Sequence, residues 1–271
     1  MESKLSGEGS TGALVRTIDM DRISSGIQGF DELVEGGLIK DRVYLVSGSS
    51  GSGKTIFSMQ FIYNGITQFK ENGVYVTFEE TPEQLRRDMS GLRWELRSLE
   101  ESGRLALIDA SSARVGLGSK EKFVIPRPVT LDSILFEIYK TIQRVGAKRV
   151  VIDCLDAMEL QAKSPEDFRT SLLKLISILK SFNCTSFLVI EAPEKKISRH
   201  GVSEFVSDGI ICLYYVLEDD RRVRKIEVLK MRGTDHSSRI VSFQIGENGI
   251  AVLSESELEK TMRKVGVGAK S

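Results

Sequence analysis

The sequence has little of what small secreted proteins and zinc proteins depend on. Its 271 residues include three cysteines, five prolines and one tryptophan. The cysteines are widely spaced and form no Cys-x-x-Cys pair, which argues against a structural zinc site of that type. All three lie in apolar, strand-like segments, so we expect small buried side chains in a reducing compartment: Cys154, Cys184 and Cys212.

The chain also lacks net charge and long apolar runs. Lys and Arg number 38 and Asp and Glu number 38, which argues against a protein that coats duplex DNA through bulk positive charge. The longest apolar run, residues 210–217, is too short to span a bilayer. Residues 1–20 contain no apolar stretch that could act as a signal peptide. These features predict a cytoplasmic protein with no membrane partner.

The composition that remains, 41% hydrophobic and 28% charged residues, is typical of a globular protein. Residues 1–17 are rich in Ser and Gly without a hydrophobic period, which indicates a flexible tail. Residues 256–271 are polar and indicate a short C-terminal helix or tail. Residues 18–255 contain no long linker and no internal repeat, so we expect them to form one domain.

Short β-branched runs alternate with longer helical patterns through most of this domain. Such alternation is typical of crossover units that build a parallel sheet covered by helices on both faces. The cap signals Thr81-Pro82 and Ser164-Pro165 each predict the start of a helix. The expected strands are 43–47, 74–78, 105–109, 149–153 and 186–191, and the expected helices are 56–70, 82–102, 131–145 and 165–182.

Two regions depart from this alternation. Residues 111–129 have several glycine or proline breaks and few apolar pairs, which indicates a long surface loop. After residue 209, the strand-like runs 209–217, 223–231, 240–245 and 250–253 are joined by short polar turns, as in antiparallel hairpins. The predicted fold class is therefore α/β, with a mainly parallel central sheet, helices on both faces and C-terminal antiparallel hairpins.

The strongest chemical pattern is a glycine-rich loop between a predicted strand and a predicted helix, which meets the Gly-x-x-x-x-Gly-Lys-Thr pattern. Its glycines let successive backbone N–H groups turn around a polyphosphate, and the helix N-terminus adds partial positive charge. Lys54 supplies a charge to the outer phosphates, and Thr55 offers a hydroxyl to Mg²⁺. The residues expected to bind ATP are Gly48, Ser49, Ser50, Gly51, Ser52, Gly53, Lys54 and Thr55.

Four acids stand where predicted strands end. Asp153 ends an apolar strand, as does the Walker B aspartate that helps to hold magnesium in P-loop ATPases. Glu79 and Glu80 follow another strand, so we expect one to orient the attacking water and the other to be structural. The alternative is that both are solvated acids before a helix. Glu191 either senses the γ-phosphate or caps its loop.

Several strings of the sequence resemble the KaiC-like family of RecA-type ATPases, named after the cyanobacterial circadian clock ATPase. The resemblance extends from about residue 23 to residue 253, and the chain resembles one family repeat where the clock protein has two in tandem. The strings are SGIQGFDEL (25–33), VTFEETP (76–82), EFVSDG (204–209) and KMRGTDH (230–236).

The resemblance implies a RecA-like fold and a homo-hexameric ring with ATP bound between subunits. Lys230 and Arg232 would match the family residues that reach the neighbour's γ-phosphate, and Thr234 and His236 would line the nucleotide from the same side. The implied catalytic residues are thus Lys54, Glu79, Glu80, Lys230 and Arg232. A purely structural alternative is that the hairpin has an outward basic face, made of Arg221, Arg222, Arg224, Lys225, Lys230 and Arg232.

The chain also departs from the family pattern. The phosphorylating clock repeat has adjacent Ser and Thr acceptors where this chain has Glu204 and Phe205, and neither can accept phosphate. Only Ser203, one position away, leaves protein kinase activity open. Cys154 stands where the family leads us to expect Ser, a change that affects packing more than chemistry.

The leading functional hypothesis is a ring-forming, Mg²⁺-dependent ATPase whose slow hydrolysis drives a regulatory or signalling change in an unknown protein partner. One alternative is a RecA-like recombinase paralogue that acts on DNA, which zero net charge and a single tryptophan make less favoured. Another is a nucleotide-gated scaffold, or a weak autokinase, in which ATP mainly stabilises the assembly.

Overall fold

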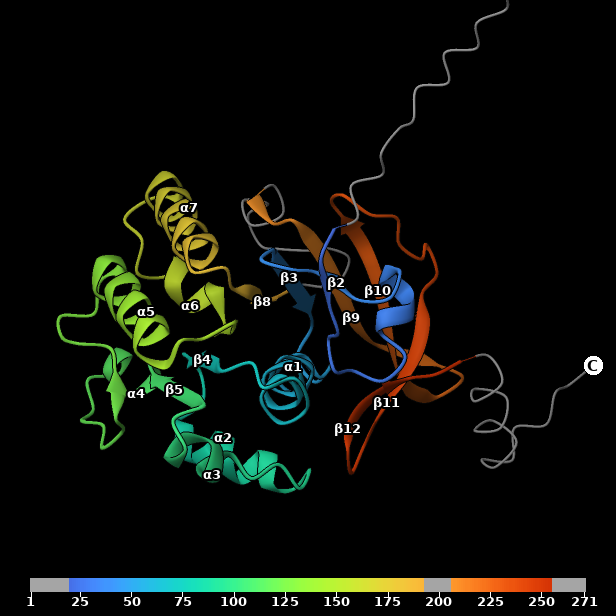
Figure 1. Ribbon diagram of the computed structural model, residues 1–271, viewed down its shortest axis with the longest axis horizontal. Helices are drawn as coiled ribbons and strands as arrows, with labels where there is room; N and C mark the ends of the chain where they lie inside the picture. Colours follow the sequence, from blue (N-terminus) through green and yellow to red (C-terminus); the bar gives the residue numbers. More distant parts are fainter. Residues whose placement is uncertain (1–19, 193–205, 255–271) are drawn as a thin grey trace, which may run out of the picture.

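The computed structural model describes residues 20–192 and 206–254, and within them ten strands form one central sheet (Figure 1). The strand order is β12-β11-β10-β9-β3-β8-β7-β4-β5-β6. The large sheet contains β3 (Val43–Gly48), β4 (Gly73–Thr77), β5 (Leu105–Asp109), β6 (Phe123–Val124), β7 (Arg149–Asp153), β8 (Thr185–Glu191), β9 (Gly209–Glu218), β10 (Arg221–Met231), β11 (Val241–Gly246) and β12 (Gly249–Val252).

The sheet is parallel from β9 through β3, β8, β7, β4 and β5 to β6. Strands β10, β11 and β12 extend it as antiparallel neighbours. This arrangement confirms the predicted α/β class with C-terminal hairpins. A separate two-stranded sheet, β1 (Arg22–Ile23) with β2 (Leu38–Ile39), lies near the start of the described chain.

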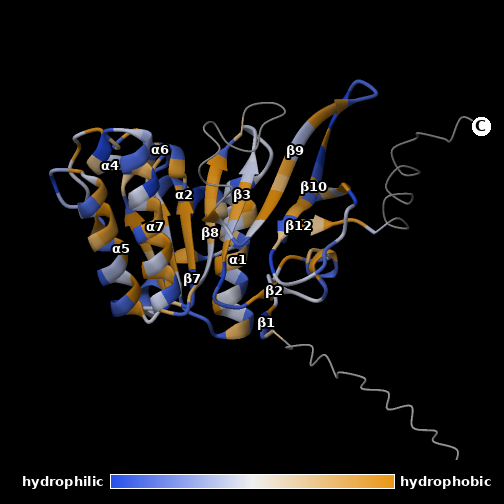
Figure 2. Ribbon diagram, turned by 90° about the horizontal axis from the view of Figure 1, so that it is seen from above, coloured by the Kyte–Doolittle hydropathy of each residue, from blue (hydrophilic) through white to orange (hydrophobic). Residues whose placement is uncertain are grey.

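Helices cover both faces of the sheet, and Figure 2 shows mostly apolar strands between helices in which hydrophobic and hydrophilic residues are mixed. Strand β3 explains the two layers, because Val43 and Leu45 pack into one core while Tyr44 and Val46 pack into the other. The helical segments are η1 (Asp31–Val34), α1 (Lys54–Phe69), α2 (Pro82–Ser90), α3 (Leu96–Glu101), α4 (Ser111–Arg114), α5 (Leu131–Val145), α6 (Leu155–Glu159) and α7 (Pro165–Ser181).

The cap signals act as predicted. The Thr81 hydroxyl accepts a hydrogen bond from the backbone N–H of Gln84 at the start of α2, and the Ser164 hydroxyl accepts one from Asp167 at the start of α7. In each case the proline that follows the cap occupies the first turn, where its missing N–H costs no hydrogen bond.

The single helix predicted for residues 82–102 is wrong, because the chain breaks between α2 and α3. Arg93 there adopts a left-handed backbone with φ +60°. The break lets Trp94 turn inward, where it is 5% exposed and stacks on Tyr63 with ring centroids 5.3 Å apart. Burial of this aromatic side chain outweighs one more helical turn.

The surface loop predicted for residues 111–129 is wrong in part. The Asp109 carboxylate accepts hydrogen bonds from the Ser111 hydroxyl and the Ser112 N–H, which start the short helix α4. Farther along, the buried Phe123 brings β6 alongside β5 at the edge of the sheet. Helix α6, η1 and the β1–β2 pair are further elements that the sequence patterns did not indicate.

The three cysteines are buried and unpaired by disulfides, as expected. Within residues 20–192 and 206–254, no helix is long and apolar enough to cross a bilayer. The expected tails 1–17 and 256–271, and the candidate acceptor Ser203, lie outside the described residues.

Candidate functional site

The glycine-rich loop joins the end of β3 to the start of α1, as the sequence pattern predicts. Gly51 and Gly53 have φ angles of +77° and +100°, a backbone region that residues with a Cβ atom rarely adopt. Lys54 begins the helix, and its Nζ donates a hydrogen bond to the Ser49 carbonyl at 3.0 Å. The loop therefore wraps around the helix N-terminus with its lysine inside the curve, a geometry that suits a bound polyphosphate.

Asp153 lies at the carboxyl end of β7, beside the start of α1. Its Oδ2 accepts hydrogen bonds from the Thr55 hydroxyl at 3.0 Å and from the Tyr75 phenol at 2.5 Å. Burial raises the pKa of the Asp153 carboxyl, and the two hydroxyl donors oppose that increase. A carboxylate beside a hydroxyl is a hard oxygen donor set, the kind that Mg²⁺ prefers, so these residues fit a magnesium ion.

The adjacent acids Glu79 and Glu80 follow β4 and have different surroundings. Glu79 is exposed, and its Oε1 accepts a hydrogen bond from the Cys154 thiol at 3.1 Å. Glu80 is half-buried, and burial raises its pKa, with further increases from the nearby Asp88, Asp153 and Glu79 carboxylates. A carboxyl with a raised pKa beside the glycine-rich loop is suited to accept a proton from water.

A cavity of about 600 Å³ connects these groups, which is within the usual size range of small-ligand pockets. The predicted residues that line it include loop residues together with Glu79, Glu80, Asp153 and Glu191. Sequence reasoning missed the other residues of the lining, which come from the first turn of α1, the end of α2, the segment after α2, the residue after β7 and the C-terminal strands: Ile56, Asp88, Met89, Gly91, Leu92, Cys154, Arg224 and Ile245.

Arg224 is the most informative of the missed residues. Its Nε donates a hydrogen bond to the Gly51 carbonyl at 3.2 Å, and its guanidinium lies 4.5 Å from the centroid of the Tyr215 ring. Arg224 therefore does not belong to the outward, solvated basic face that was the structural alternative for this hairpin. The only sequence signal was the cluster of basic residues at 221–225, which does not say which of them turns toward the loop.

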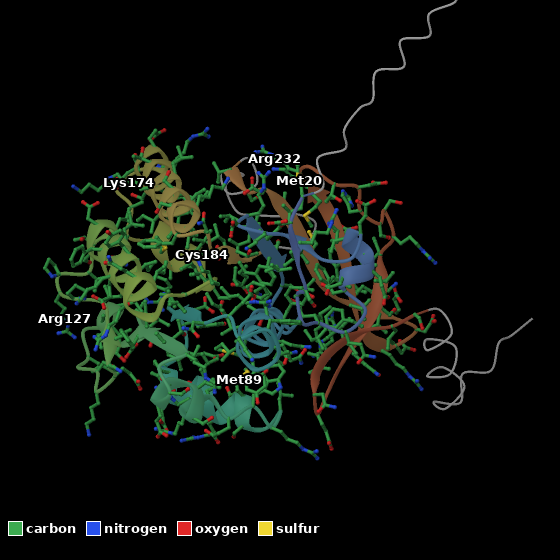
Figure 3. The ribbon with its side chains drawn as sticks, in the orientation of Figure 1. Met20, Met89, Arg127, Lys174, Cys184 and Arg232 are labelled. Atoms are coloured by element: carbon green, nitrogen blue, oxygen red, sulfur yellow. The ribbon has the colours of Figure 1, made fainter. Side chains whose placement is uncertain are left out.

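Lys230 and Arg232 lie at the opposite end of the strands from the glycine-rich loop. The loop follows the carboxyl end of β3, whereas these two residues lie near the amino end of β9. Lys230 pairs with Ile210 near the start of β9, where its Nζ donates a hydrogen bond to the Ser207 carbonyl at 2.7 Å. Desolvation lowers the pKa of the Lys230 amine, and the Arg232 charge lowers it further. Figure 3 shows Arg232 beside Met20, on the other side of the molecule from the cavity residue Met89.

Thr234 and His236 follow these two cations and also lie outside the cavity lining. The Thr234 hydroxyl accepts a hydrogen bond from Arg22 at 2.5 Å and donates one to Glu35. The His236 Nδ1 lies 3.1 Å from the Ser237 carbonyl. One chain thus brings together the loop and the strand-end acids, while Lys230, Arg232, Thr234 and His236 form a second group at a distance.

Comparison with known proteins identifies close relatives. A family model described as "ATPase: KaiC" matches residues 23–257. The circadian clock oscillator protein KaiC of Parathermosynechococcus lividus is 38% identical over 249 residues, 91% of this chain and 45% of that protein. The same protein of Synechococcus elongatus is 38% identical over 247 residues, 90% of this chain and 46% of that protein. The chain spans about half the length of these curated relatives.

A solved structure agrees with this assignment in length as well as in fold. The KaiC-like protein of the hyperthermophilic archaeon Pyrococcus horikoshii OT3 is 36% identical, with a TM-score of 0.76. The alignment covers 87% of this chain and 100% of that one. With a matching family model, matching curated sequences and a matching three-dimensional structure, the chain belongs to the KaiC family of ATPases.

Proposed function

We propose that this protein binds ATP with Mg²⁺ and hydrolyses it slowly at the boundary between two copies of the chain in a homo-hexameric ring. The cycle would drive a regulatory or signalling change in a protein partner. The observation that carries the proposal is the separation of the acids from two of the cations. The glycine-rich loop and the acids share a cavity, while Lys230 and Arg232 lie at the opposite end of the strands.

The loop and helix α1 would bind the phosphates. Backbone N–H groups of residues 48–55 and the Lys54 amine neutralise the phosphate oxygens, with the partial positive charge of the helix N-terminus. The Thr55 hydroxyl and the Asp153 carboxylate would hold Mg²⁺, which would supply positive charge to the bound triphosphate. Because Thr55 donates its proton to Asp153, its oxygen lone pairs stay available to the ion.

The acid pair would act on water. One carboxylate of Glu79 and Glu80 orients a water molecule in line with the γ-phosphorus and accepts its proton as the oxygen–phosphorus bond forms and the bond to the β-phosphate breaks. The Cys154 thiol limits the movement of Glu79, and the raised pKa of Glu80 makes it a better proton acceptor than an exposed carboxylate. The products are ADP and inorganic phosphate.

The nucleoside would occupy the end of the cavity lined by Arg224 and Ile245. A planar guanidinium and a branched aliphatic side chain offer a cation–π surface and an apolar surface to a heterocyclic base.

The adjoining copy would complete the site. A protomer cannot direct its own Lys230 at its own loop, because β10 runs away from the loop toward the start of β9. In a head-to-tail ring, however, the same edge of one copy faces the cavity of the next. Cations supplied in this way stabilise the charge that develops on the transferred phosphoryl group, and in P-loop enzymes they raise the rate by roughly 10³ to 10⁵.

Mixing two inactive variants tests this arrangement. Lys54→Ala removes the phosphate lysine and Arg232→Ala removes the donated cation, so each variant alone should hydrolyse ATP at background rate. An equimolar mixture, refolded or exchanged together, should recover about a quarter of wild-type turnover, since half of the loops are intact and half of those meet an intact Arg232.

The control for mixing is Lys174→Ala, an exposed residue of α7 far from both groups. Mixed with Lys54→Ala, it should retain about half of wild-type turnover, because every intact loop meets an intact Arg232. If the Lys54→Ala and Arg232→Ala mixture stays at background while this control mixture is active, the shared site is wrong. The recombinase and scaffold alternatives are not favoured by the family assignment.

A further inference from the structure

Tyr75 carries a phenol in the interior of the sheet, where phenylalanine would fill the same space. It lies in the middle of β4, pairs with Leu107 on one side and Val151 on the other, and has no exposed surface. A buried hydroxyl must find a hydrogen-bond partner, because water cannot reach it. The neighbours of Tyr75 in both adjacent strands are aliphatic, so the partner lies elsewhere.

The partner is Asp153, two residues farther along β7 than the residue opposite Tyr75. The phenol donates to Oδ2 at 2.5 Å, and the Thr55 hydroxyl donates to the same oxygen at 3.0 Å. Two donors from different elements, a strand and the first turn of α1, therefore act on one carboxylate oxygen. Together they fix the rotation of the carboxylate about its Cβ–Cγ bond.

We propose that Tyr75 is a positioning residue for the nucleotide-bound divalent cation: its phenol holds Oδ2 of Asp153, so that Oδ1 and the Thr55 hydroxyl oxygen serve the cation or its water. This inference rests on the proposed function, since it requires a cation at Thr55 and Asp153. Without the phenol, Oδ2 keeps only the Thr55 donor, and the carboxylate can rotate away from the orientation that serves the ion. Hydrogen bonds to metal-binding side chains typically change metal affinity by about 10–100-fold.

The chain offers a matched control in Tyr44 of β3. It is also almost fully buried in the same sheet and core, and its phenol also donates to an oxygen, the Ile39 carbonyl at 2.8 Å. That carbonyl is not part of the cavity lining among the described residues. Tyr44→Phe and Tyr75→Phe therefore remove the same group from similar surroundings, and only Tyr75→Phe removes it from Asp153.

The experiment measures cation binding without turnover. The full-length chain is titrated with Mn²⁺ in the presence of saturating ADP, and free Mn²⁺ is followed by electron paramagnetic resonance. We expect Tyr75→Phe to weaken Mn²⁺ binding about tenfold and Tyr44→Phe to change it less than about twofold. In EDTA, a fluorescent ADP should bind both variants as it binds the wild-type chain, because the loop contacts are intact.

Equal Mn²⁺ affinity in wild type and Tyr75→Phe, with similar losses of thermal stability in the two variants, would make Tyr75 a structural residue and overturn the inference. If Tyr75→Phe does not fold, 3-fluorotyrosine placed at position 75 keeps the phenol. Its fluorine resonance should then shift when Mg²⁺ is added to the ADP complex, while the same label at position 44 should not. An unchanged resonance at position 75 would also overturn the inference.

The same titration separates this inference from the function on which it rests. A wild-type chain that binds ADP and Mn²⁺, with Tyr75→Phe equal to it, contradicts only the role of Tyr75. A wild-type chain that binds fluorescent ADP in EDTA but takes up no Mn²⁺ contradicts the magnesium site and the role of Tyr75 together. A chain that binds neither contradicts the proposed function as a whole.

Discussion

Arg149 is a fully buried cation in the first position of β7, and its guanidinium joins three parts of the chain. It donates to the carbonyls of Ser24 and Phe61, each at 2.9 Å, and its Nε forms an ion pair with Glu71 at 2.6 Å. Burial lowers its pKa, while the Glu71 charge opposes that decrease. Gly65 leaves room for it, since a Cβ there would lie 2.3 Å from the arginine Cδ.

Replacement of Arg149 should be costly for stability. Arg149→Met retains an unbranched chain of similar length. It removes the hydrogen bonds to the Ser24 and Phe61 carbonyls and the ion pair with the partly buried Glu71 carboxylate, so we expect the free energy of unfolding to fall by about 3–5 kcal/mol. Urea denaturation followed by circular dichroism measures the change. Lys148→Met, next to it and exposed, is the control and should shift stability by less than about 0.5 kcal/mol. A similar small shift for Arg149→Met would contradict this account.

The acid pair makes a prediction about pH. Burial and the charge of Asp88 raise the pKa of Glu80. Because a general base must be ionised, turnover should decline as the pH is lowered, and the decline should begin at a higher pH than it would with an exposed glutamate. Asp88→Asn removes one of the charges that raise this pKa. The acidic limb of the kcat/KM profile should therefore move to lower pH.

Glu83→Gln provides the control for the pH profile. It removes the same charge from the same helix, but Glu83 is not among the groups that raise the pKa of Glu80. Its acidic limb should coincide with that of wild type. An unchanged limb in Asp88→Asn would mean that Glu80 does not control the acidic limb.

At the scale of elements, the β9–β10 hairpin connects the cavity, which Arg224 lines, to the region of Lys230 and Arg232. Near its turn, Arg224 pairs with Tyr215 and contacts the glycine-rich loop, and at its other end Lys230 pairs with Ile210. The hydrophilic turn projects from the body of the molecule in Figure 2. One pair of strands therefore joins the proposed nucleotide site to the residues that we propose contact the next copy.

A β-bulge in this hairpin decides which face Lys230 occupies. The register shifts between Val228 and Lys230, so Val228 lies opposite Ile211 while Lys230 lies opposite Ile210. These partners belong to the two different cores. Simple alternation would keep Val228 and Lys230 on one face, and the bulge separates them.

Removal of Arg224 should weaken nucleotide binding. Arg224→Ala deletes the hydrogen bond to Gly51, the ring contact with Tyr215 and one wall of the cavity, so we expect the Kd for ADP to rise about tenfold. Titration with fluorescent ADP measures it. Arg222→Ala also removes a guanidinium that lies over Tyr215, but one that does not line the cavity, and it should leave the Kd within about twofold. Equal effects of the two substitutions would contradict the assignment.

At the scale of the whole molecule, the cavity and Lys230 lie at opposite ends of the strands of one sheet. This is the arrangement that a head-to-tail assembly requires, because each copy offers a cavity on one side and cations on another. In the proposed function, the nucleotide bound at this boundary links the two copies.

Assembly should follow nucleotide binding. We expect the wild-type chain to sediment as a ring with a non-hydrolysable ATP analogue and Mg²⁺ and as smaller species without nucleotide, because each bound triphosphate adds contacts across a boundary. Analytical ultracentrifugation measures the distribution. Lys54→Ala should lose the response to the analogue, while Lys174→Ala should keep it. A wild-type chain that remains monomeric with every nucleotide would contradict the shared site.

The alternation of strands and helices, the two capped helix starts and the glycine-rich loop were predictable because each depends on residues that are neighbours in the sequence. Hydrophobic period, caps and glycine φ angles act within a few residues. The break before Trp94 was not predictable in this way, since it depends on the distant Tyr63 ring. The turn of Arg224 toward Gly51 depends in the same manner on a contact between segments far apart in the chain.

The sequence by itself determined the glycine-rich loop, the acids at the strand ends and the α/β class, because backbone geometry and hydrophobic periodicity are local properties. The tertiary structure alone decided that Tyr75 contacts Asp153, that Arg224 lines the cavity and that Lys230 lies near the start of β9, away from the loop. Each of these depends on strand order, on register or on a bulge. Such features arise from packing between residues that are distant in sequence, and no local pattern encodes them.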